Sequence, residues 1–533
     1  MDKNAIKKYA VWARNELIAR VTQKAEQYEI TENKITSADA DSIGGRVLSA
    51  TERKQRQALI KKINADGFGQ VMEEVAYTWF NRFTALRFME VNNYLPSHTR
   101  VFTNEAGEFK PQILTDAIHL EMDGLDIDKV YELKDANKTE ELYKYLLTVQ
   151  CNALSDVLPG IFQRINDFSE LLIPDYLLRD GSIIEQMISV IPAEDWLDQV
   201  QIIGWLYQYY ISDPKDALIN AKKQYKDSDI PFVTQIFTSD WIVHYMVQNS
   251  LGRAWINCTG NNYSKYGWEY YLAERNPRKE SNNINPINVR VIDPCMGSGH
   301  IIAYVFDVLM SMYEDEGYSQ REAAELILEN NIYGMDISER AYQLAYFSVM
   351  MKARKYNRTV FRKKIHPHLY LLKDIQAFGK DLIDFISDEN VEIKELLNKV
   401  ENELKGLGQY GSLISTKTGN YQMVLDRIAE IESNSYDDLI SCAYQEEACG
   451  RVKNAIEICV ALSSQYDAVI TNPPYVGNKF LPNSMRNYIE TNFREYKSDI
   501  FAAFVARVIE MCKRDGHIGM LTQSSPNLCV NYL

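Results

Sequence analysis

The fold of this chain is decided by the stretch Val289-Arg-Val-Ile-Asp-Pro-Cys-Met-Gly-Ser-Gly-His300. It begins with a short run rich in β-branched residues, typical of a buried strand, and an apolar segment at 301–313 predicts a helix after the glycines. A glycine-rich turn between strand and helix lets the backbone approach a nucleotide-like ligand closely, because glycine has no Cβ. The stretch therefore predicts an α/β domain with a ligand-binding turn.

Two further segments extend this pattern into a mainly parallel sheet. Residues 331–337 and 369–374 predict strands that end in Asp336 and Asp374. In parallel α/β sheets an acid at such a position bonds ribose hydroxyls. The interval from Gly299 to Asp336 exceeds the roughly 20 residues of a dinucleotide fingerprint and leaves room for two helices, and the turn lacks the Gly-x-Gly-x-x-Gly spacing. A nicotinamide enzyme is therefore disfavoured.

A polar amide, two prolines and an aromatic follow another predicted strand, in the stretch Asp467-Ala-Val-Ile-Thr-Asn-Pro-Pro-Tyr-Val-Gly477. Asn472 offers a side-chain oxygen, and Pro473 and Pro474 lack an N–H, which leaves the surrounding carbonyls free to face a ligand. Tyr475 offers a flat face on which a nucleobase can stack, a contact worth about 1–3 kcal/mol. An ordinary strand-ending turn explains the tetrapeptide equally well by itself. The glycine-rich turn upstream favours a site.

The 533 residues are enough for two or more domains. Residues 1–230 carry apolar positions at three- and four-residue spacing, which predicts a helical N-terminal domain, and we assign the α/β catalytic domain to 231–533. Charged helical segments over about 380–461 predict an insertion in the second domain, with a Gly/Ser-rich break inside it. In the helix expected over 71–94, the aromatic residues predict core. Arg82 and Arg87 could pair with acids or touch phosphate, and we favour a solvated face for both.

The composition limits the partners and the compartment. The net charge of −15 argues against a general attraction to nucleic acid, so any such contact must be local. The eight cysteines contain no Cys-x-x-Cys pair and the histidines only one close pair, so we expect neither a disulfide framework nor a metal site. The chain shows no signal segment and no apolar run of membrane-spanning length, which predicts a cytoplasmic protein without membrane contact.

Two motifs carry a family resemblance. The stretch from Asp293 to Gly299 resembles motif I, and Asn472-Pro473-Pro474-Tyr475 resembles motif IV, of amino-group DNA methyltransferases. Motif I before motif IV, with a Thr238-Ser239 helix start before both, resembles the gamma class of adenine-N6 enzymes. The wider text, including Val75 to Arg82, is similar to the adenine-specific methyltransferases of BREX phage-defence systems over nearly the whole chain. The resemblance implies a Rossmann-like domain, S-adenosylmethionine as cofactor and double-stranded DNA as partner.

The resemblance also implies a role for each motif residue. The residues implied in cofactor binding are Thr238 and Ser239 near the methionine part, Asp293, Pro294, Gly297 and Gly299 as the cradle, Asp336 at the ribose and Asp374 near the cofactor's adenine ring. The residues implied at the target base are Asn472, Pro473, Pro474 and Tyr475. The adenine amine is a poor nucleophile because its lone pair is delocalised into the ring. If the Asn472 oxygen and the carbonyl beside Pro473 accept its hydrogens, the nitrogen is driven toward tetrahedral geometry without a strong base.

The chain departs from the family pattern near its end. Family members continue into a target-recognition domain, which we expect to be absent here, so that this chain is truncated and binds duplex DNA weakly or not at all. Whether it is active or inactive alone is left open. Residues 523–530 also differ from the aromatic segment that usually follows 520–522. A local basic edge that could meet phosphates is formed by Lys479, Arg486, Arg494 and Lys497.

Two other functions are also compatible with the sequence. A non-catalytic scaffold of a phage-defence complex, with other defence proteins as partners, would explain the helical N-terminal half and the acidic composition. Methylation of a protein glutamine would also suit Asn-Pro-Pro-Tyr, since that substrate is a side-chain amide.

Overall fold

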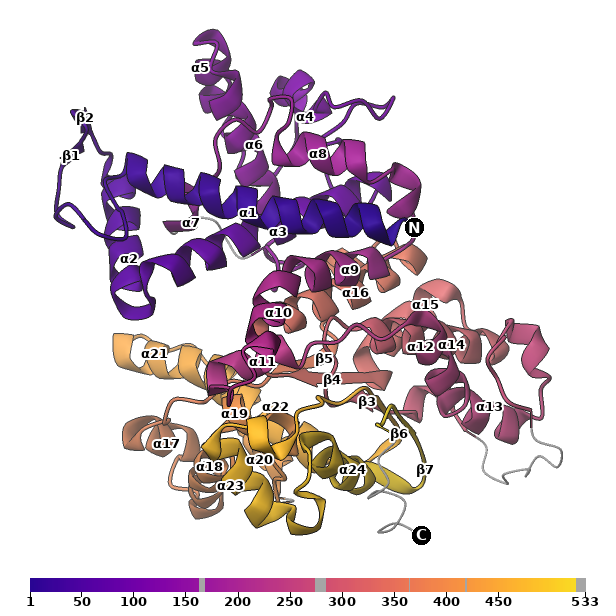
Figure 1. Cartoon of the computed structure of the whole chain (residues 1–533). Helices are drawn as coiled ribbons and strands as arrows, with labels where there is room; N and C mark the ends of the chain where they lie inside the picture. Colours follow the sequence, from indigo (N-terminus) through magenta and orange to yellow (C-terminus); the bar gives the residue numbers. More distant parts are fainter. Residues whose placement is uncertain (163–167, 274–283, 364, 418, 524–533) are drawn as a thin grey trace. The chain divides into compact units, whose positions relative to one another are not determined.

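The computed structural model describes residues 1–162, 168–273, 284–363, 365–417 and 419–523 (Figure 1). It forms two compact units. The first comprises Met1–Asp216 with Tyr346–Lys364, and the second comprises Ala217–Ala345 with Ile365–Leu533. The units therefore divide at 216/217, whereas the sequence suggested 230. The segment Tyr346–Lys364 groups with the first unit, where Phe347 packs edge-on against Phe88 with ring centroids 5.9 Å apart.

The first unit is helical, as its apolar spacing predicts. Its elements are α1 (Lys3–Gln27), β1 (Ser42–Ile43), β2 (Arg46–Val47), α2 (Ala50–Asp66), α3 (Phe68–Val91), α4 (Gln112–Thr115), α5 (Ile127–Asp135), α6 (Thr139–Ala153), α7 (Phe168–Leu171), α8 (Ile183–Val190) and α9 (Gln201–Tyr210). Two helices run from one unit into the other along the chain, α10 (Ser212–Asn220) and α16 (Glu339–Tyr356).

Helix α3 lies at the centre of the first unit and is buried on every side from Trp79 to Glu90. The expectation that Arg82 and Arg87 lie on a solvated face is wrong, because each is only 3% exposed. Arg87 forms an ion pair with Glu90 at 2.6 Å, one turn along the same helix. The helical spacing located the helix, but it did not reveal that other segments cover the polar side of the helix as well.

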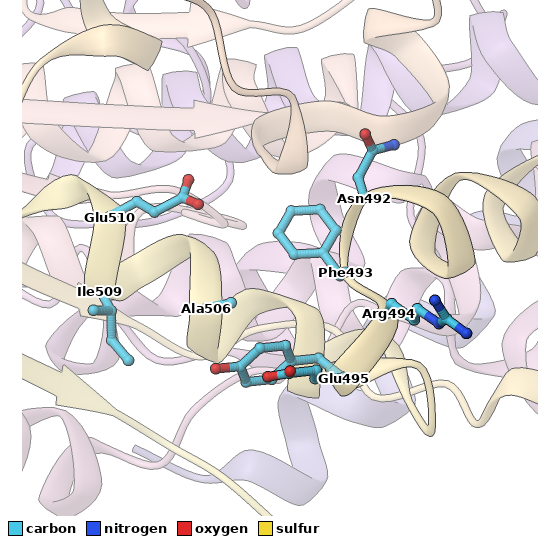
Figure 2. A pocket seen from close by; sticks show the side chains of 8 residues that line it. Asn492, Phe493, Arg494, Glu495, Ala506, Ile509 and Glu510 are labelled. Carbon is cyan, nitrogen blue, oxygen red and sulfur yellow. The ribbon is translucent and has the colours of Figure 1, made fainter.

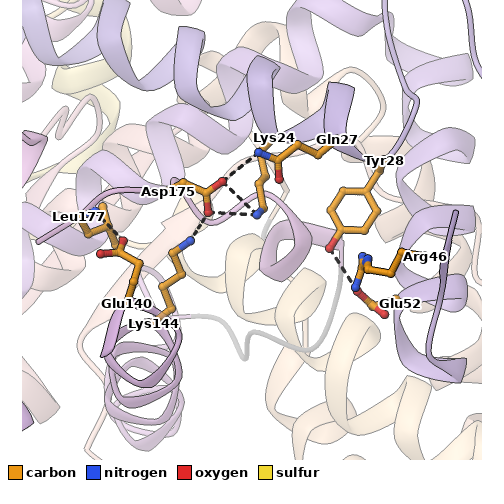
Figure 3. Close-up of polar contacts among 9 residues, drawn as sticks. All are labelled: Lys24, Gln27, Tyr28, Arg46, Glu52, Glu140, Lys144, Asp175 and Leu177. Carbon is orange, nitrogen blue, oxygen red and sulfur yellow. Dashed lines mark hydrogen bonds and ion pairs between the residues drawn. The ribbon is translucent and has the colours of Figure 1, made fainter. Parts of the chain in front are cut away.

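A polar cluster joins elements of the first unit that are far apart in sequence (Figure 3). Asp175 accepts hydrogen bonds from Lys24 and Gln27 of α1, each at 3.0 Å, and from Lys144 of α6. Partial burial by itself raises the pKa of Asp175, but the hydrogen bonds from Lys144 and Lys24 outweigh burial and lower that pKa to about 2. The carboxyl therefore stays ionised and ties α1 to α6.

The second unit is built on a five-stranded parallel sheet with the order β5-β4-β3-β6-β7. The strands are β3 (Val291–Asp293), β4 (Ile332–Asp336), β5 (His368–Leu371), β6 (Tyr466–Thr471) and β7 (Cys512–Met520). In register, Val291 pairs with Ile332 on one side and with Ala468 on the other. The mainly parallel sheet of the predicted α/β fold is confirmed.

The helices of the second unit cover both faces of this sheet (Figure 1). They are α11 (Ile230–Val233), α12 (Asp240–Gln248), α13 (Leu251–Thr259), α14 (His300–Asp315), α15 (Gln320–Leu326), α17 (Lys380–Ser387), α18 (Val391–Glu403), α19 (Leu407–Tyr410), α20 (Tyr421–Ser433), α21 (Leu439–Glu447), α22 (Lys453–Ser463), α23 (Asn483–Asn492) and α24 (Ile500–Met511). Helix α14 contacts β3 and β4, and α14 and α15 are the two helices expected between Gly299 and Asp336.

The segment predicted as an insertion belongs to the core of the second unit. Residues Leu382, Leu397, Val424 and Ile456 lie in one apolar cluster with the sheet residue Val469. Helices α17, α18, α20 and α22 therefore bury one face of the sheet, and the whole segment connects β5 to β6 across β4 and β3. No helix in the described ranges is long and apolar enough to cross a membrane.

Candidate active site

The two motifs meet because β3 and β6 are neighbours. The chain leaves β3 toward β4 and β5 and then returns to place β6 on the other side of β3, so the carboxyl ends of β3 and β6 form the topological switch point of the sheet. Ligands of open α/β sheets bind in the crevice at such a point. Asp293 ends β3 and Asn472 directly follows β6. The Thr471 hydroxyl donates to Asp293 Oδ1 at 2.7 Å and joins the two motifs.

The glycine-rich turn after β3 is shaped by its backbone. Gly297 (φ 52°) and Gly299 (φ 78°) occupy left-handed conformations that favour glycine. A Cβ on Gly299 would lie 2.7 Å from the Cα of Ala345, so this glycine allows α14 and α16 to approach each other closely. A Cβ on Gly297 would meet no atom within 4 Å, and the Gly297 N–H donates to Asp336 Oδ2 at 2.9 Å. Packing against Ala345 therefore fills the space beside Gly299, whereas the space beside Gly297 is open.

Two acids lie beside this turn with raised pKa values. Asp293 is 2% exposed, and burial raises its pKa to about 7, against hydrogen bonds from Thr471 and the Cys295 N–H that lower it. Its Oδ2 atom has no hydrogen-bond partner. Burial also raises the pKa of Asp336 to about 6, although the N–H groups of Ser338 and Gly297 oppose the rise. An orphaned buried carboxylate oxygen is costly, and a bound ligand that donates a hydrogen bond would relieve the cost.

The Asn472 side chain is held from two sides. Its Nδ2 donates to the Thr238 hydroxyl at 3.0 Å, and its Oδ1 lies 2.8 Å from the Tyr475 hydroxyl. The same hydroxyl lies 2.7 Å from the Leu521 carbonyl, so its single proton is directed to one of two acceptors. Three residues that the sequence assigned to two subsites therefore form one connected group, Thr238, Asn472 and Tyr475.

The aromatic ring of Tyr475 is half-buried and lies 5.7 Å from the ring of Phe501, tilted by 42°. Burial raises the pKa of Tyr475, so its hydroxyl stays protonated and can donate. Pro473 is buried and Pro474 is half-buried. The stacking of a nucleobase on Tyr475 stays a prediction.

His300, the first residue of α14, was missed by the sequence reasoning. Its Nδ1 lies 3.0 Å from the Thr238 carbonyl, its Nε2 lies 2.9 Å from an Asp240 carboxylate oxygen, and its ring stacks on Phe237 at 4.4 Å. It therefore fixes the segment that carries Thr238. Its place directly after the second glycine of the turn was the signal available in the sequence.

Ser239 occupies the N-cap position of α12, but its side chain makes no capping hydrogen bond. The helix start expected at Thr238-Ser239 is therefore found there, without a hydrogen bond from the Ser239 side chain to the first turn.

Asp374 lies apart from the other predicted site residues. It follows β5, which is separated from β3 by β4, and its side chain is exposed. Its Oδ1 accepts a hydrogen bond from the Gly408 N–H at 3.0 Å. The described residues show no hydrogen bond between Asp374 and any other predicted site residue.

The basic edge after Tyr475 is only partly available for phosphates. Arg486 donates to the carbonyls of Asn478 and Leu481 at 3.1 and 3.3 Å, so it serves to hold its own loop. Arg494 lines a surface groove of about 370 Å³ together with Glu495 and Glu510 (Figure 2). The groove carries both signs of charge, while Lys479 and Lys497 stay exposed.

Within the described ranges, no group of three or more histidine, cysteine, aspartate or glutamate side chains is arranged to hold a metal ion. The predicted departure at 523–530 lies outside the described residues except for Gln523.

Comparison with known proteins finds a matching family model and two similar proteins. A model described as the Eco57I restriction-modification methylase matches residues 330–527, which include β4 to β7 and Asn472. The chain is 36% identical over 568 residues to the adenine-specific methyltransferase PglX of Lacticaseibacillus casei (strain Zhang). It is 33% identical over 577 residues to the adenine-specific methyltransferase BrxX of Escherichia coli O9:H4 (strain HS).

Each of these two alignments covers 98% of this chain and 47% of the relative, so the chain spans about half the length of the curated relatives it matches. Among solved structures, a DrdV–DNA complex studied by cryo-electron microscopy aligns with 90% of this chain and 39% of its own chain, at 12% identity and a TM-score of 0.30. Over nearly its whole length, the chain is similar to the proteins named adenine-specific methyltransferases PglX and BrxX, and its residues 330–527 match the Eco57I methylase model.

Proposed function

We propose that this chain holds S-adenosylmethionine and transfers the methyl group to the exocyclic amine of adenine in DNA, in a phage-defence system. The observation that supports this most is the position of Asn472 and Asp293 at the carboxyl ends of two adjacent strands, joined by the Thr471 hydroxyl. The relatives named adenine-specific methyltransferases support the same chemistry.

The residues at the switch point fit the cofactor. The unpartnered Asp293 Oδ2 can accept a hydrogen bond, the open side of Gly297 leaves space for a ligand, and Asp336 adds a second acceptor. S-adenosylmethionine carries amine and hydroxyl donors and a positive charge, which these acids complement. When bound, it supplies a methyl group on a positively charged sulfur. Asp293, Pro294, Gly297, Gly299 and Asp336 would hold it.

The target amine would be held by Asn472. A carboxamide oxygen has two lone pairs, so the Tyr475 hydroxyl occupies only one and the other can accept an N–H of the substrate. The Pro473 carbonyl would accept the second N–H. Thr238, itself positioned by His300, keeps the amide from rotating. The nitrogen lone pair would then point away from the acceptors and toward the methyl group.

The test is methyl transfer to nucleosides. The protein is incubated with labelled S-adenosylmethionine and duplex or single-stranded DNA, the DNA is digested, and label in N6-methyladenine is measured. We expect label with the unchanged protein, a loss of more than about a hundredfold with Asn472→Ala, and no change with Asn398→Ala, an exposed asparagine on α18. Label in protein glutamine, or none in adenine although the cofactor binds, would contradict the proposal.

A second candidate is a non-catalytic scaffold within a phage-defence complex. It is favoured by the net charge of −15 and by the internal engagement of Arg486, which leave little basic surface for DNA. Phage challenge of cells carrying Asn472→Ala distinguishes the two, because a scaffold keeps its protection and an enzyme loses it.

A further inference from the structure

One segment, residues 407–414, runs past the carboxyl ends of three neighbouring strands; we call it the strap. After β5, the N–H of Gly408 donates to Asp374 Oδ1 at 3.0 Å. After β4, Gly411 packs so tightly that a Cβ on it would lie 2.8 Å from Cγ2 of Ile337. After β3, the Ser412 hydroxyl donates to the Pro294 carbonyl at 2.6 Å. The strap thus contacts the turn after each strand that carries a predicted cofactor residue.

Arg507 of α24 fixes the C-terminal end of the strap. Its guanidinium donates to the carbonyls of Ser412 at 2.9 Å, Ile414 at 3.0 Å and Leu462 at 2.7 Å. Leu462 lies in α22, which leads directly into β6. Arg507 is 2% exposed and forms an ion pair with Glu510 at 3.1 Å. A planar fork of donors is suited to hold several carbonyls in fixed directions.

Aromatic contacts fix the middle of the strap. The ring of Tyr410 stacks on that of Tyr488 with centroids 4.0 Å apart and planes 10° from parallel, and the Tyr488 hydroxyl lies 3.3 Å from the Leu413 carbonyl. Gly411 has a φ of 55°, which disfavours any side chain there besides the clash with Ile337.

Simple packing does not require this arrangement. Burying a guanidinium is costly, and apolar residues of similar volume stabilise a core at least as well. A buried hydroxyl that donates to the carbonyl of the glycine-rich turn is likewise unnecessary for burying apolar surface. Arg507 instead holds the Ser412 carbonyl, and the Ser412 hydroxyl holds the Pro294 carbonyl. Together these two bonds fix the backbone position of the turn at Pro294.

We infer that the strap forms one wall of the cofactor pocket, and that Ser412 and Arg507 are positioning residues that set the glycine-rich turn for the adenosine part of the cofactor. The inference rests on the proposed function and deepens it. The strap contacts Pro294 after β3 and Asp374 after β5. Because it links these two positions, Asp374 can belong to the same pocket although β5 lies two strands away from β3.

The test measures binding of S-adenosylmethionine and S-adenosylhomocysteine by calorimetry, without turnover. Ser412→Ala removes one hydroxyl and leaves a buried carbonyl unpaired, so we expect Kd for both ligands to rise about tenfold. Gly411→Ala displaces the strap from Ile337 and is expected to raise Kd at least as much. Far-UV circular dichroism should stay unchanged in both variants.

Two matched controls separate positioning from general stability. Gly450→Ala lies in the same β5 to β6 connection, where a Cβ would meet nothing within 4 Å, and Ile428→Val weakens the same core away from the strap. Both should bind with Kd within about twofold of the unchanged protein. Weaker binding in Ile428→Val by the same factor as in Ser412→Ala would overturn the inference.

The remaining outcomes are also decisive. If Ser412→Ala and Gly411→Ala bind the cofactor as tightly as the unchanged protein, the strap is not a pocket wall, while the proposed function stands. If the folded, unchanged protein binds neither ligand, the proposed function and the inference fail together.

Discussion

Each unit contains a carboxylate that is buried to the same extent, but the two carboxylates differ in their hydrogen-bond partners. Glu90 of α3 and Asp293 of β3 are each 2% exposed. Glu90 bonds to Arg87 and to the Phe102 N–H at 2.6 Å and to the Thr103 hydroxyl at 2.9 Å, so both of its oxygens are occupied. Asp293 bonds through Oδ1 only, and its Oδ2 has no partner.

This difference separates an acid whose hydrogen bonds are complete from an acid that the proposed function assigns to ligand binding. In the first unit the Glu90 carboxylate has a partner on each oxygen, which stabilises one conformation of the loop after α3. The second unit leaves an acceptor unsatisfied at the switch point of the sheet, where an unmade hydrogen bond lowers stability unless a ligand supplies the donor. We therefore expect Asp293 to lower the stability of the ligand-free protein and to favour ligand binding, and we expect neither effect from Glu90.

The largest expected effect is at Glu90. Glu90→Gln leaves the buried Arg87 without its counter-charge, so we expect the free energy of unfolding to fall by about 3–5 kcal/mol, measured by urea denaturation. The double variant Arg87→Met, Glu90→Leu removes both charges and should recover much of that loss. A single variant that costs less than about 1 kcal/mol would show that the pair behaves like a surface ion pair.

The second effect is at Asp293 and depends on pH. Its pKa in the fold, about 7, lies above the usual value of 3.8, so between these pH values the folded state holds a proton that the unfolded state has lost. The stability that Asp293 contributes is therefore fully present below about pH 4 and is lost as the pH rises through about 7, at about 1.4 kcal/mol per pKa unit.

Asp293→Asn removes this dependence. We expect thermal denaturation without ligand to show a variant that is more stable than the unchanged protein at pH 8, by a few kcal/mol, and equal to it near pH 4, while binding of S-adenosylmethionine weakens. The exposed Asp515→Asn is the control, and its stability should equal that of the unchanged protein at both pH values. Equal pH profiles for Asp293→Asn and the unchanged protein would refute a raised pKa at this site.

The smallest effect is at Thr471. Thr471→Val removes the hydroxyl that bonds Asp293 Oδ1 and should raise the pKa of Asp293 further, because that bond lowers it. We expect a loss of about 1–2 kcal/mol at pH 8 and less at pH 5, from denaturation curves at both values. Thr84→Val in α3 is the matched buried control, since its hydroxyl bonds only a carbonyl of its own helix, and any loss there should not vary with pH.

Local patterns in the sequence predicted much of the fold. The strand before Asp293, the glycines, helix α14 and the strand before Asn472 lie where periodicity and turn residues place them. Those signals are local, since a β-branched run, a glycine or a proline restricts its own backbone.

Contacts between distant segments were not predictable in this way. The burial of Arg82 and Arg87, the internal use of Arg486 and the role of His300 depend on which segments cover these side chains. A helical pattern reports which face is apolar, but it does not report whether another element covers the polar face.

The sequence by itself determined that two strands end in a glycine-rich turn and in Asn-Pro-Pro-Tyr, because residue type restricts the local backbone. Only the tertiary structure decided that these ends are neighbours, that Thr238 and Tyr475 hold the amide of Asn472, and that a strap closes over Pro294 while Asp293 Oδ2 stays unpaired. The physical reason is the strand order. The return of the chain across β4 and β3 brings residues hundreds of positions apart to one edge of the sheet, and no spacing along the sequence encodes that crossing.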